Sequence, residues 1–303
     1  MTKIKNYAGR GDLGRSAFIS VGLLLAGVAF TSNLNAGALQ HFDVLVADSQ
    51  ATVYRVDPRT GERTIVAQGG KLERPYDLAQ KRDGTIVVSD TATLRIVQLN
   101  PSTQEQTVLA EGGELGVPFG IDVDQHNRIY VANSSAIVRV NPETRQVETI
   151  AKGGLLQVPL DVAAAPDGSL YVADALAGIV RVDPATQEQT LITKGDLLHQ
   201  SIGIALDGNR SAYVADAGGQ CIVSVDLKNG SQKLVSMAGL LTTPVGIAVG
   251  PGGTLLVSDP DTFDLDGGIM TISPDGTQIP ITRGFGDLVN ARGIAIVPAL
   301  KAR

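Results

Sequence analysis

The chain has 303 residues, a formal net charge of −6 and no tryptophan, and aromatic residues make up only 4% of it. The acidic balance argues against nucleic acid and anionic membrane surfaces as partners, because both repel a negatively charged protein. The scarcity of aromatic residues argues against a carbohydrate-binding surface built on stacked rings.

Residues 1–38 have the order of a secretory signal peptide, with a basic start, an apolar run and a small-residue cleavage site. The basic residues are Lys3, Lys5, Arg10 and Arg15. The apolar run at 17–30, AFISVGLLLAGVAF, would reach about 21 Å as a helix, short of the roughly 30 Å hydrocarbon core, so an uncleaved anchor is the weaker alternative. Ala36 and Ala38 form an A-x-A site, and we therefore predict cleavage near Ala38 and a periplasmic or secreted protein that does not bind the membrane after cleavage.

The remaining residues, 39–303, are predicted to form one domain with a net charge of −9, because the removed segment carries four basic residues and one acidic residue. A motif, Pro-x-[Gly/Asp]-[Ile/Leu/Val], recurs along this domain with successive spacings of 43, 41, 42, 43 and 47 residues. Its copies are PYDLA at Pro75, PFGID at Pro118, PLDVA at Pro159, SIGIA at Ser201, PVGIA at Pro244 and ARGIA at Ala291. A fixed period of this length indicates a repeat architecture.

Each period contains four short apolar runs separated by turn signals. In the unit from Pro159 these are LDVAAA, LYVAD, IVRVDP and QTLIT, with PDGS between the first two. Alternating β-branched residues bounded by such turns predict antiparallel strands. Four strands per unit of about 40–45 residues are typical of a β-propeller; a parallel β-helix and a sandwich are the alternatives.

The two ends of the domain predict six blades and a closed ring. The domain begins at a second strand, DVLVAD, with no first strand before it, and it ends on an unpaired first strand, GIAIVP, from Gly293. The C-terminal strand therefore completes the N-terminal blade. Such closure removes the open sheet edges that promote aggregation.

Two repeated features are expected to be structural. An Asp or Asn ends each second strand, and because every blade has one, we expect it to bind backbone N–H groups of the adjacent loops. These residues are Asp48, Asp90, Asn133, Asp174, Asp216 and Asp259. The glycine pairs at 69–70, 112–113 and 153–154 suit a tight exit from the fourth strand.

Function is expected where the repeats differ, at the mouth of the channel lined by the first strands. The residue after the motif proline is Tyr76, Phe119, Leu160, Ile202, Val245 or Arg292. An arginine among apolar groups suits a ligand with an apolar body and a carboxylate or phosphate, although these side chains could instead plug the channel. The next position holds Asp77 and Asp161 in two blades and glycine in the other four.

The unit at 159–184 resembles the NHL-repeat propellers and is similar to the gluconolactonase/senescence-marker lactonases and the streptogramin lyases, over about 42–298. The resemblance implies a six-bladed fold and, for the lactonases, a divalent metal held by Asn and Asp at these motifs. The matching residues here are Phe119, Ile202 and Val245, which have no oxygen donor, whereas a hard cation needs about six. The streptogramin lyases use a histidine after a motif proline, and no matching position has one.

Other reactive side chains give weaker signals. His199 is the one histidine on the mouth side, and the sole cysteine, Cys221, falls in a predicted buried strand. Asp261, Asp264 and Asp266 crowd an insertion at 259–268 and are candidate ligands for calcium or another divalent cation, although a solvated acidic turn is the simpler interpretation.

Two functions remain open. The first is a monomeric, non-catalytic propeller that binds a protein partner or a small apolar or anionic ligand at the channel mouth, without a cofactor. The second is a divergent metal-dependent hydrolase or lyase. In the second, Arg292 would stabilise the negative charge that develops during the reaction, and His199 is a candidate general base. The oxygen ligands of the metal would come from Asp77 and Asp161, together with Asp261, Asp264 and Asp266.

Overall fold

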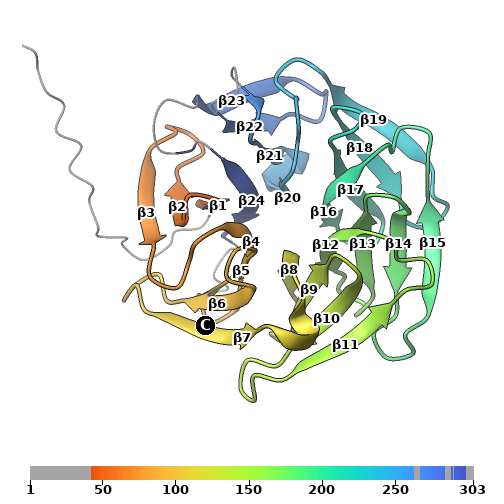
Figure 1. The fold of residues 1–303 in the computed structure, drawn as a ribbon. Coiled ribbons are helices and arrows are strands. Elements are labelled where there is room, and N and C mark those ends of the chain that lie inside the picture. The colour runs from red at the N-terminus through yellow and green to blue at the C-terminus, as the bar shows by residue number, and fades with distance from the viewer. Residues whose placement is uncertain (1–41, 263–266, 284–287, 289, 298–303) are drawn as a thin grey trace, which may run out of the picture. The chain divides into compact units, whose positions relative to one another are not determined.

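The computed structural model describes residues 42–262, 267–283, 288 and 290–297, and these form a ring of six four-stranded antiparallel sheets (Figure 1). This confirms the predicted six-bladed propeller. Asp264 and Asp266 lie outside the described residues, as does the predicted signal segment. Within the described residues, no helix has the length and apolar character needed to cross a membrane.

The closing blade uses strands from both ends of the domain, and the second and third blades each use four consecutive strands. The closing blade contains β24 (Ala291–Ile296), β1 (Val44–Asp48), β2 (Thr52–Val56) and β3 (Arg63–Gln68). The second contains β4 (Pro75–Gln80), β5 (Ile86–Asp90), β6 (Arg95–Leu99) and β7 (Gln106–Glu111). The third contains β8 (Pro118–Val123), β9 (Ile129–Asn133), β10 (Ala136–Val140) and β11 (Val147–Lys152), preceded by a 3-10 turn at Gly113–Leu115.

The other three blades repeat this order. The fourth contains β12 (Pro159–Ala164), β13 (Leu170–Asp174), β14 (Gly178–Val182) and β15 (Gln189–Thr193). The fifth contains β16 (Ser201–Asp207), β17 (Ser211–Asp216), β18 (Cys221–Asp226) and β19 (Gln232–Met237). The sixth contains β20 (Ile247–Val249), β21 (Leu255–Asp259), β22 (Gly268–Ile272) and β23 (Gln278–Arg283), with a 3-10 turn at Pro251–Gly253.

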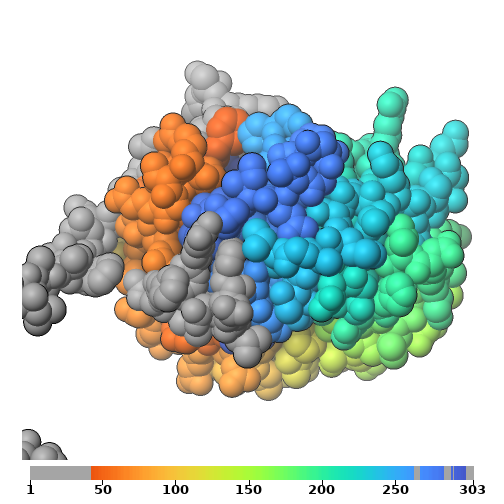
Figure 2. All heavy atoms as spheres, turned by 90° about the horizontal axis from the view of Figure 1, so that it is seen from above, coloured from red at the N-terminus to blue at the C-terminus, as the bar shows by residue number. Residues whose placement is uncertain are grey.

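The ring closes where the two ends of the domain pair. Val44 of β1 pairs with Ile296 of β24 and Val46 with Ile294, in antiparallel register. The N-terminal and C-terminal surfaces accordingly adjoin in the space-filling view (Figure 2). The predicted pairing of the last strand with the first is therefore confirmed.

The apolar core lies between the blades. Each of six buried clusters contains side chains from two neighbouring sheets, for example Leu45 with Leu78 and Tyr130 with Val162. A second strand such as β13 is buried along its whole length because both of its faces meet a neighbouring blade. This explains why segments such as LYVAD are apolar at nearly every position instead of alternating.

Candidate functional site

A β-bulge near the start of several inner strands leaves one residue without a partner on the neighbouring strand. Pro75 pairs with Asp90 and Asp77 with Ser89, so Tyr76 between them has no partner on β5. Leu160 and Ile202 are left unpaired in the same way. Bulges re-aim a side chain next to functional sites, and here they fall at motif positions where the repeats differ.

The mouth contains a recess of about 560 Å³ with two arginines. Its lining residues are Ser49, Arg74, Pro75, Tyr76, Thr91, Val117, Phe119, Asn290 and Arg292. Tyr76 and Phe119 meet edge to face, with ring centroids 5.1 Å apart and an interplanar angle of 73°. Asn290 Oδ1 is buried there and accepts no hydrogen bond from the described residues. The recess thus offers an aromatic wall, two cations and, among the described lining residues, no carboxylate.

A second cavity of about 360 Å³ follows the channel below the recess, and Tyr76 lines both. Asp77, Asp122 and Asp161 line one part of this cavity, whereas β16, β20 and β24 contribute aliphatic side chains and glycine to it. Ile202 and Val245 line the channel cavity, whereas Leu160, which we expected at the mouth, lines neither space. The predicted ring of mouth residues is therefore divided between two cavities.

The channel carboxylates connect neighbouring blades. Asp77 Oδ2 accepts the Ile121 N–H at 2.9 Å, Asp122 Oδ2 the Ala164 N–H at 2.8 Å and Asp161 Oδ2 the Ile204 N–H at 2.8 Å. Each acceptor belongs to one inner strand and each donor to the inner strand of the next blade. Asp122 and Asp161 also accept the N–H of the following residue through Oδ1, both at 2.7 Å.

Glycine makes room for two of these carboxylates. A Cβ at Gly293 would overlap Asp77, and a Cβ at Gly120 would overlap Asp161. Packing between adjacent blades therefore accounts for the presence of Asp in one blade and Gly in the next at this motif position. The Asp carboxylate occupies the space that a side chain at the glycine would need.

Burial changes the acidity of the channel carboxyls. Each retains some accessible area because it faces the channel, but protein surrounds it closely enough for desolvation to dominate. Desolvation raises the pKa of Asp77 to about 7 and that of Asp122 to about 6, against the lowering effect of backbone N–H donors. Desolvation, reinforced by the charge of Asp77, raises the pKa of Asp161 well above its usual value. Burial also raises the pKa of the Tyr76 phenol, which Arg292 partly opposes.

The divalent metal implied by the resemblance does not fit these residues. The side chains of Phe119, Ile202 and Val245 have no oxygen or nitrogen that could bind a metal. Asp77 Oδ2 and both carboxylate oxygens of Asp161 already accept backbone N–H groups. No three His, Cys, Asp or Glu side chains in the described part of the chain are arranged to hold a metal ion. Asp261, the one described member of the crowded aspartates, donates its N–H to Asp259 at 3.1 Å.

His199 and Cys221 line neither of the two cavities. The exposed His199 ring lines neither cavity and contacts the Leu197 carbonyl at 3.3 Å, so its proposed role as a base there gains no geometric support. Cys221 is buried on β18 as predicted, and burial raises the pKa of its thiol to about 11, which disfavours the nucleophilic thiolate.

The residues that end the second strands act as predicted. Asp174 Oδ2 accepts the N–H groups of Gln157 (2.7 Å) and Val158 (2.9 Å) in the incoming loop. Its Oδ1 accepts those of Leu176 (3.0 Å) and Ala177 (2.8 Å) in the next turn. At the one amide, Asn133, Nδ2 instead donates to the Leu115 carbonyl at 3.1 Å.

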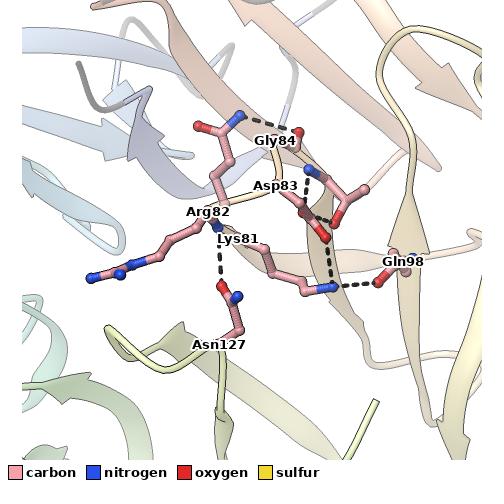
Figure 3. Close-up of polar contacts among 8 residues, drawn as sticks. Lys81, Arg82, Asp83, Gly84, Gln98 and Asn127 are labelled. Atoms are coloured by element: carbon pink, nitrogen blue, oxygen red, sulfur yellow. Dashed lines mark hydrogen bonds and ion pairs between the residues drawn. The ribbon is translucent and has the colours of Figure 1, made fainter. Parts of the chain in front are cut away.

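A groove of about 1150 Å³ lies on the opposite face, beside the turns that end β4 and β8. Lys81, only 10% exposed, donates to Asp83 at 3.2 Å and to Gln98 at 3.0 Å (Figure 3). The Arg82 N–H donates to Asn127 at 3.1 Å, while its guanidinium points away from the other labelled side chains. Because the groove contains carboxylates that pair with its cations, it offers less unpaired charge than the mouth recess.

Residues 78–284 match the family model described as the SMP-30/gluconolactonase/LRE-like region, more than half of the chain. The chain belongs to this family. No curated protein matches it. A solved chain from the crystal structure of a nidogen/laminin complex is 17% identical, with a TM-score of 0.71, over 84% of this chain and 97% of that one. At this identity the likeness shows the six-bladed fold alone.

Sequence reasoning missed Asp122, Arg74 and Asn290. Asp122 had a detectable signal, since the fifth motif position is alanine in the other five blades. Arg74 and Asn290 precede their motifs, and only the folded loops bring them to the recess.

Proposed function

We propose that this member of the family is a non-catalytic binding propeller whose mouth recess takes a small ligand with an anionic group and an apolar body. The observation that supports it is the convergence of Arg74 and Arg292 with the Tyr76–Phe119 pair on one recess. Guanidinium groups bind carboxylate and phosphate through paired hydrogen bonds, and the rings supply apolar contact. Asn290 and the hydroxyls of Ser49 and Thr91 add polar groups at the rim.

The recess also has a suitable size. Its volume of about 560 Å³ falls in the range of small-molecule sites, which combine apolar walls with a few polar groups. Residues 39–303 have a net charge of −9, so an anion needs a local attraction at its site, and the two arginines of the recess supply it.

Isothermal titration with benzoate, phenyl phosphate, benzenesulfonate and neutral benzamide tests this proposal. We expect the three anions to bind and benzamide to bind at least tenfold more weakly. Arg292→Met should weaken anion binding by about 10- to 100-fold, the value of one or two charge-assisted hydrogen bonds. Arg82→Met is the matched control, because Arg82 is exposed on the opposite face. Equal affinities for the anions and benzamide, or equal losses in both variants, would contradict the proposal.

A divergent hydrolase or lyase is the second candidate, because a carboxyl with a pKa of about 7 lies beside the recess in a family that includes lactonases. Groups with such a pKa serve as general acids or bases near neutral pH. Turnover of lactones or esters by purified protein, abolished by Asp77→Asn and retained in Asp122→Asn, would favour it over simple binding.

We further propose that the protein is exported and acts outside the cytoplasm, on the basis of the charged, apolar and small-residue order of residues 1–38. The intact mass of the protein recovered from its native host tests this. Recovery of the full-length chain from the cytoplasmic fraction would contradict export.

A further inference from the structure

We propose that the Asp77–Asp161 carboxyl pair is a proton-binding site that controls the affinity of the mouth recess for anions. The proposal rests on the anion-binding function above and adds its regulation. When both carboxyls are ionised, their charge opposes that of Arg292 on an incoming anion. When the pair holds a proton, this opposition falls and the anion binds more tightly.

The pair lines the channel cavity, which shares Tyr76 with the recess. Tyr76, the residue before Asp77, lines both cavities, and its phenol lies within electrostatic range of Arg292 above and of Asp77 and Asp161 below. Each carboxylate is held by the backbone N–H of the next inner strand, at 2.9 Å for Asp77 and 2.8 Å for Asp161. These bonds, with the glycines against which the carboxylates pack, fix the pair in place.

The neighbouring strands determine which other charges act on the pair. β8 contributes Asp122, β24 contributes Arg292, and the segment before β4 contributes Arg74. At the channel, β16 and β20 present aliphatic side chains and glycine. Asp90 on β5 and Asp174 on β13 direct their oxygens to loop N–H groups, at 2.7 Å for the shortest contact of each, and so face the loops.

Two physical causes raise the pKa of these carboxyls. Their surroundings solvate the charged forms poorly, and neighbouring carboxylates add repulsion: Asp122 raises the pKa of Asp77, and Asp77 and Asp122 raise that of Asp161. Asp77 and Asp161 therefore titrate together, and the pKa of about 7 at Asp77 lies within the pH range of the binding measurements. By reciprocity, if an anion binds more tightly to the protonated form of the protein, the protein must take up protons as the anion binds.

Calorimetry with benzenesulfonate tests the linkage, because this probe stays ionised across the range used. We expect its affinity to be about tenfold higher at pH 5.5 than at pH 8.5, within the usual range for coupled sites. At pH 7 the observed enthalpy should vary with the ionisation enthalpy of the buffer, with a slope that indicates proton uptake. Phosphate buffer is avoided, since it would compete for the recess.

The variants identify the proton site. Asp77→Asn and Asp161→Asn should each reduce the pH dependence and the proton uptake by more than half. Glu143→Gln, at an exposed turn beside the groove on the opposite face, is the matched control and should retain both effects. Asp122→Asn should reduce them less than the pair variants do, because the Asp122 charge raises the pKa of Asp77 and of Asp161. If neither pair variant folds, as judged by circular dichroism, the buffer dependence of the wild-type enthalpy decides alone.

The outcomes separate this inference from the proposed function. Binding that is independent of pH and buffer overturns the linkage and leaves the anion site standing. A pH dependence that disappears in Asp122→Asn but persists in both pair variants also overturns it. Absence of benzenesulfonate binding at every pH overturns both.

Discussion

The channel carboxyls predict that the protein becomes more stable as the pH falls from 8 to 5.5. A carboxyl whose pKa is higher in the folded state than in the unfolded chain binds its proton more tightly when folded. Its contribution is therefore full at low pH and lost as the pH rises through the folded pKa. Asp77, with a pKa of about 7, and Asp122, with a pKa of about 6, both have an unfolded value of 3.8. Asp161 acts in the same direction.

The size of the effect follows from these values. Between pH 8 and pH 5.5, Asp77 should add about 2 kcal/mol and Asp122 about 0.8 kcal/mol to the free energy of unfolding. Carboxyls with lowered pKa values, such as Asp83 and Asp183, act in the opposite direction, but only as the pH falls below 3.8. The window also stays above the sequence isoelectric point of about 5.1.

Urea unfolding at pH 5.5, 6.5, 7.3 and 8 measures the effect. With a slope of about 3 kcal/mol per molar urea, the midpoint should be about 1 M higher at pH 5.5 than at pH 8. Asp77→Asn should remove most of this difference and Asp122→Asn a smaller part. Glu143→Gln, at an exposed turn, should leave it unchanged. A midpoint that stays constant or falls on acidification would refute the assignment of buried protons to the channel.

Three further predictions concern the ring itself. Gly120→Ala should lower the free energy of unfolding by at least about 2 kcal/mol in urea titrations, because its Cβ would overlap Asp161. Gly69→Ala has open space around it and should cost about 1 kcal/mol, because residue 69 has a left-handed backbone conformation. Equal losses in the two variants would contradict this. Asp174→Ala should lower the free energy of unfolding by about 3 kcal/mol or more, because four backbone N–H groups lose their acceptor, and Asp174→Asn should lower it by less. A larger loss in Asp174→Asn than in Asp174→Ala would be inconsistent with a role as hydrogen-bond acceptor. Deleting residues 291–303 removes β24 and should yield aggregates on size-exclusion chromatography, because β1 keeps β2 but loses its other partner and presents an open edge; a stable monomer would argue against closure by this strand.

The sequence was sufficient for the fold because each blade repeats the same local solution. The local features that define a blade can each be recognised within one repeat. They are the strand patterns, the D-G and D-P turns, and the Asp or Asn at the end of each second strand. Closure by β24 also followed from the order of strands at the two ends, since an unpaired first strand at one end complements its absence at the other.

The site was only partly predictable because it depends on contacts between blades. Asp77 and Asp161 stood out as exceptions to glycine, but their N–H donors lie on Ile121 and Ile204, about one repeat further along the chain. The same bulge register also leads to different surroundings in different blades. Leu160 occupies the same motif position as Tyr76 yet lines neither cavity, which no single repeat reveals.

The bulges explain how one fold can retain its ring while its mouth changes. Asp77 and the residues on either side of the bulge pair with β5 or contact the adjacent blades, so substitutions there disturb closure. Tyr76 has no cross-strand partner, and its side chain faces the two cavities. Selection for a new ligand can therefore act on the bulge residues with little effect on blade packing. Because Arg292 occupies this position in the closing blade, the strand that completes the ring also supplies a cation to the recess.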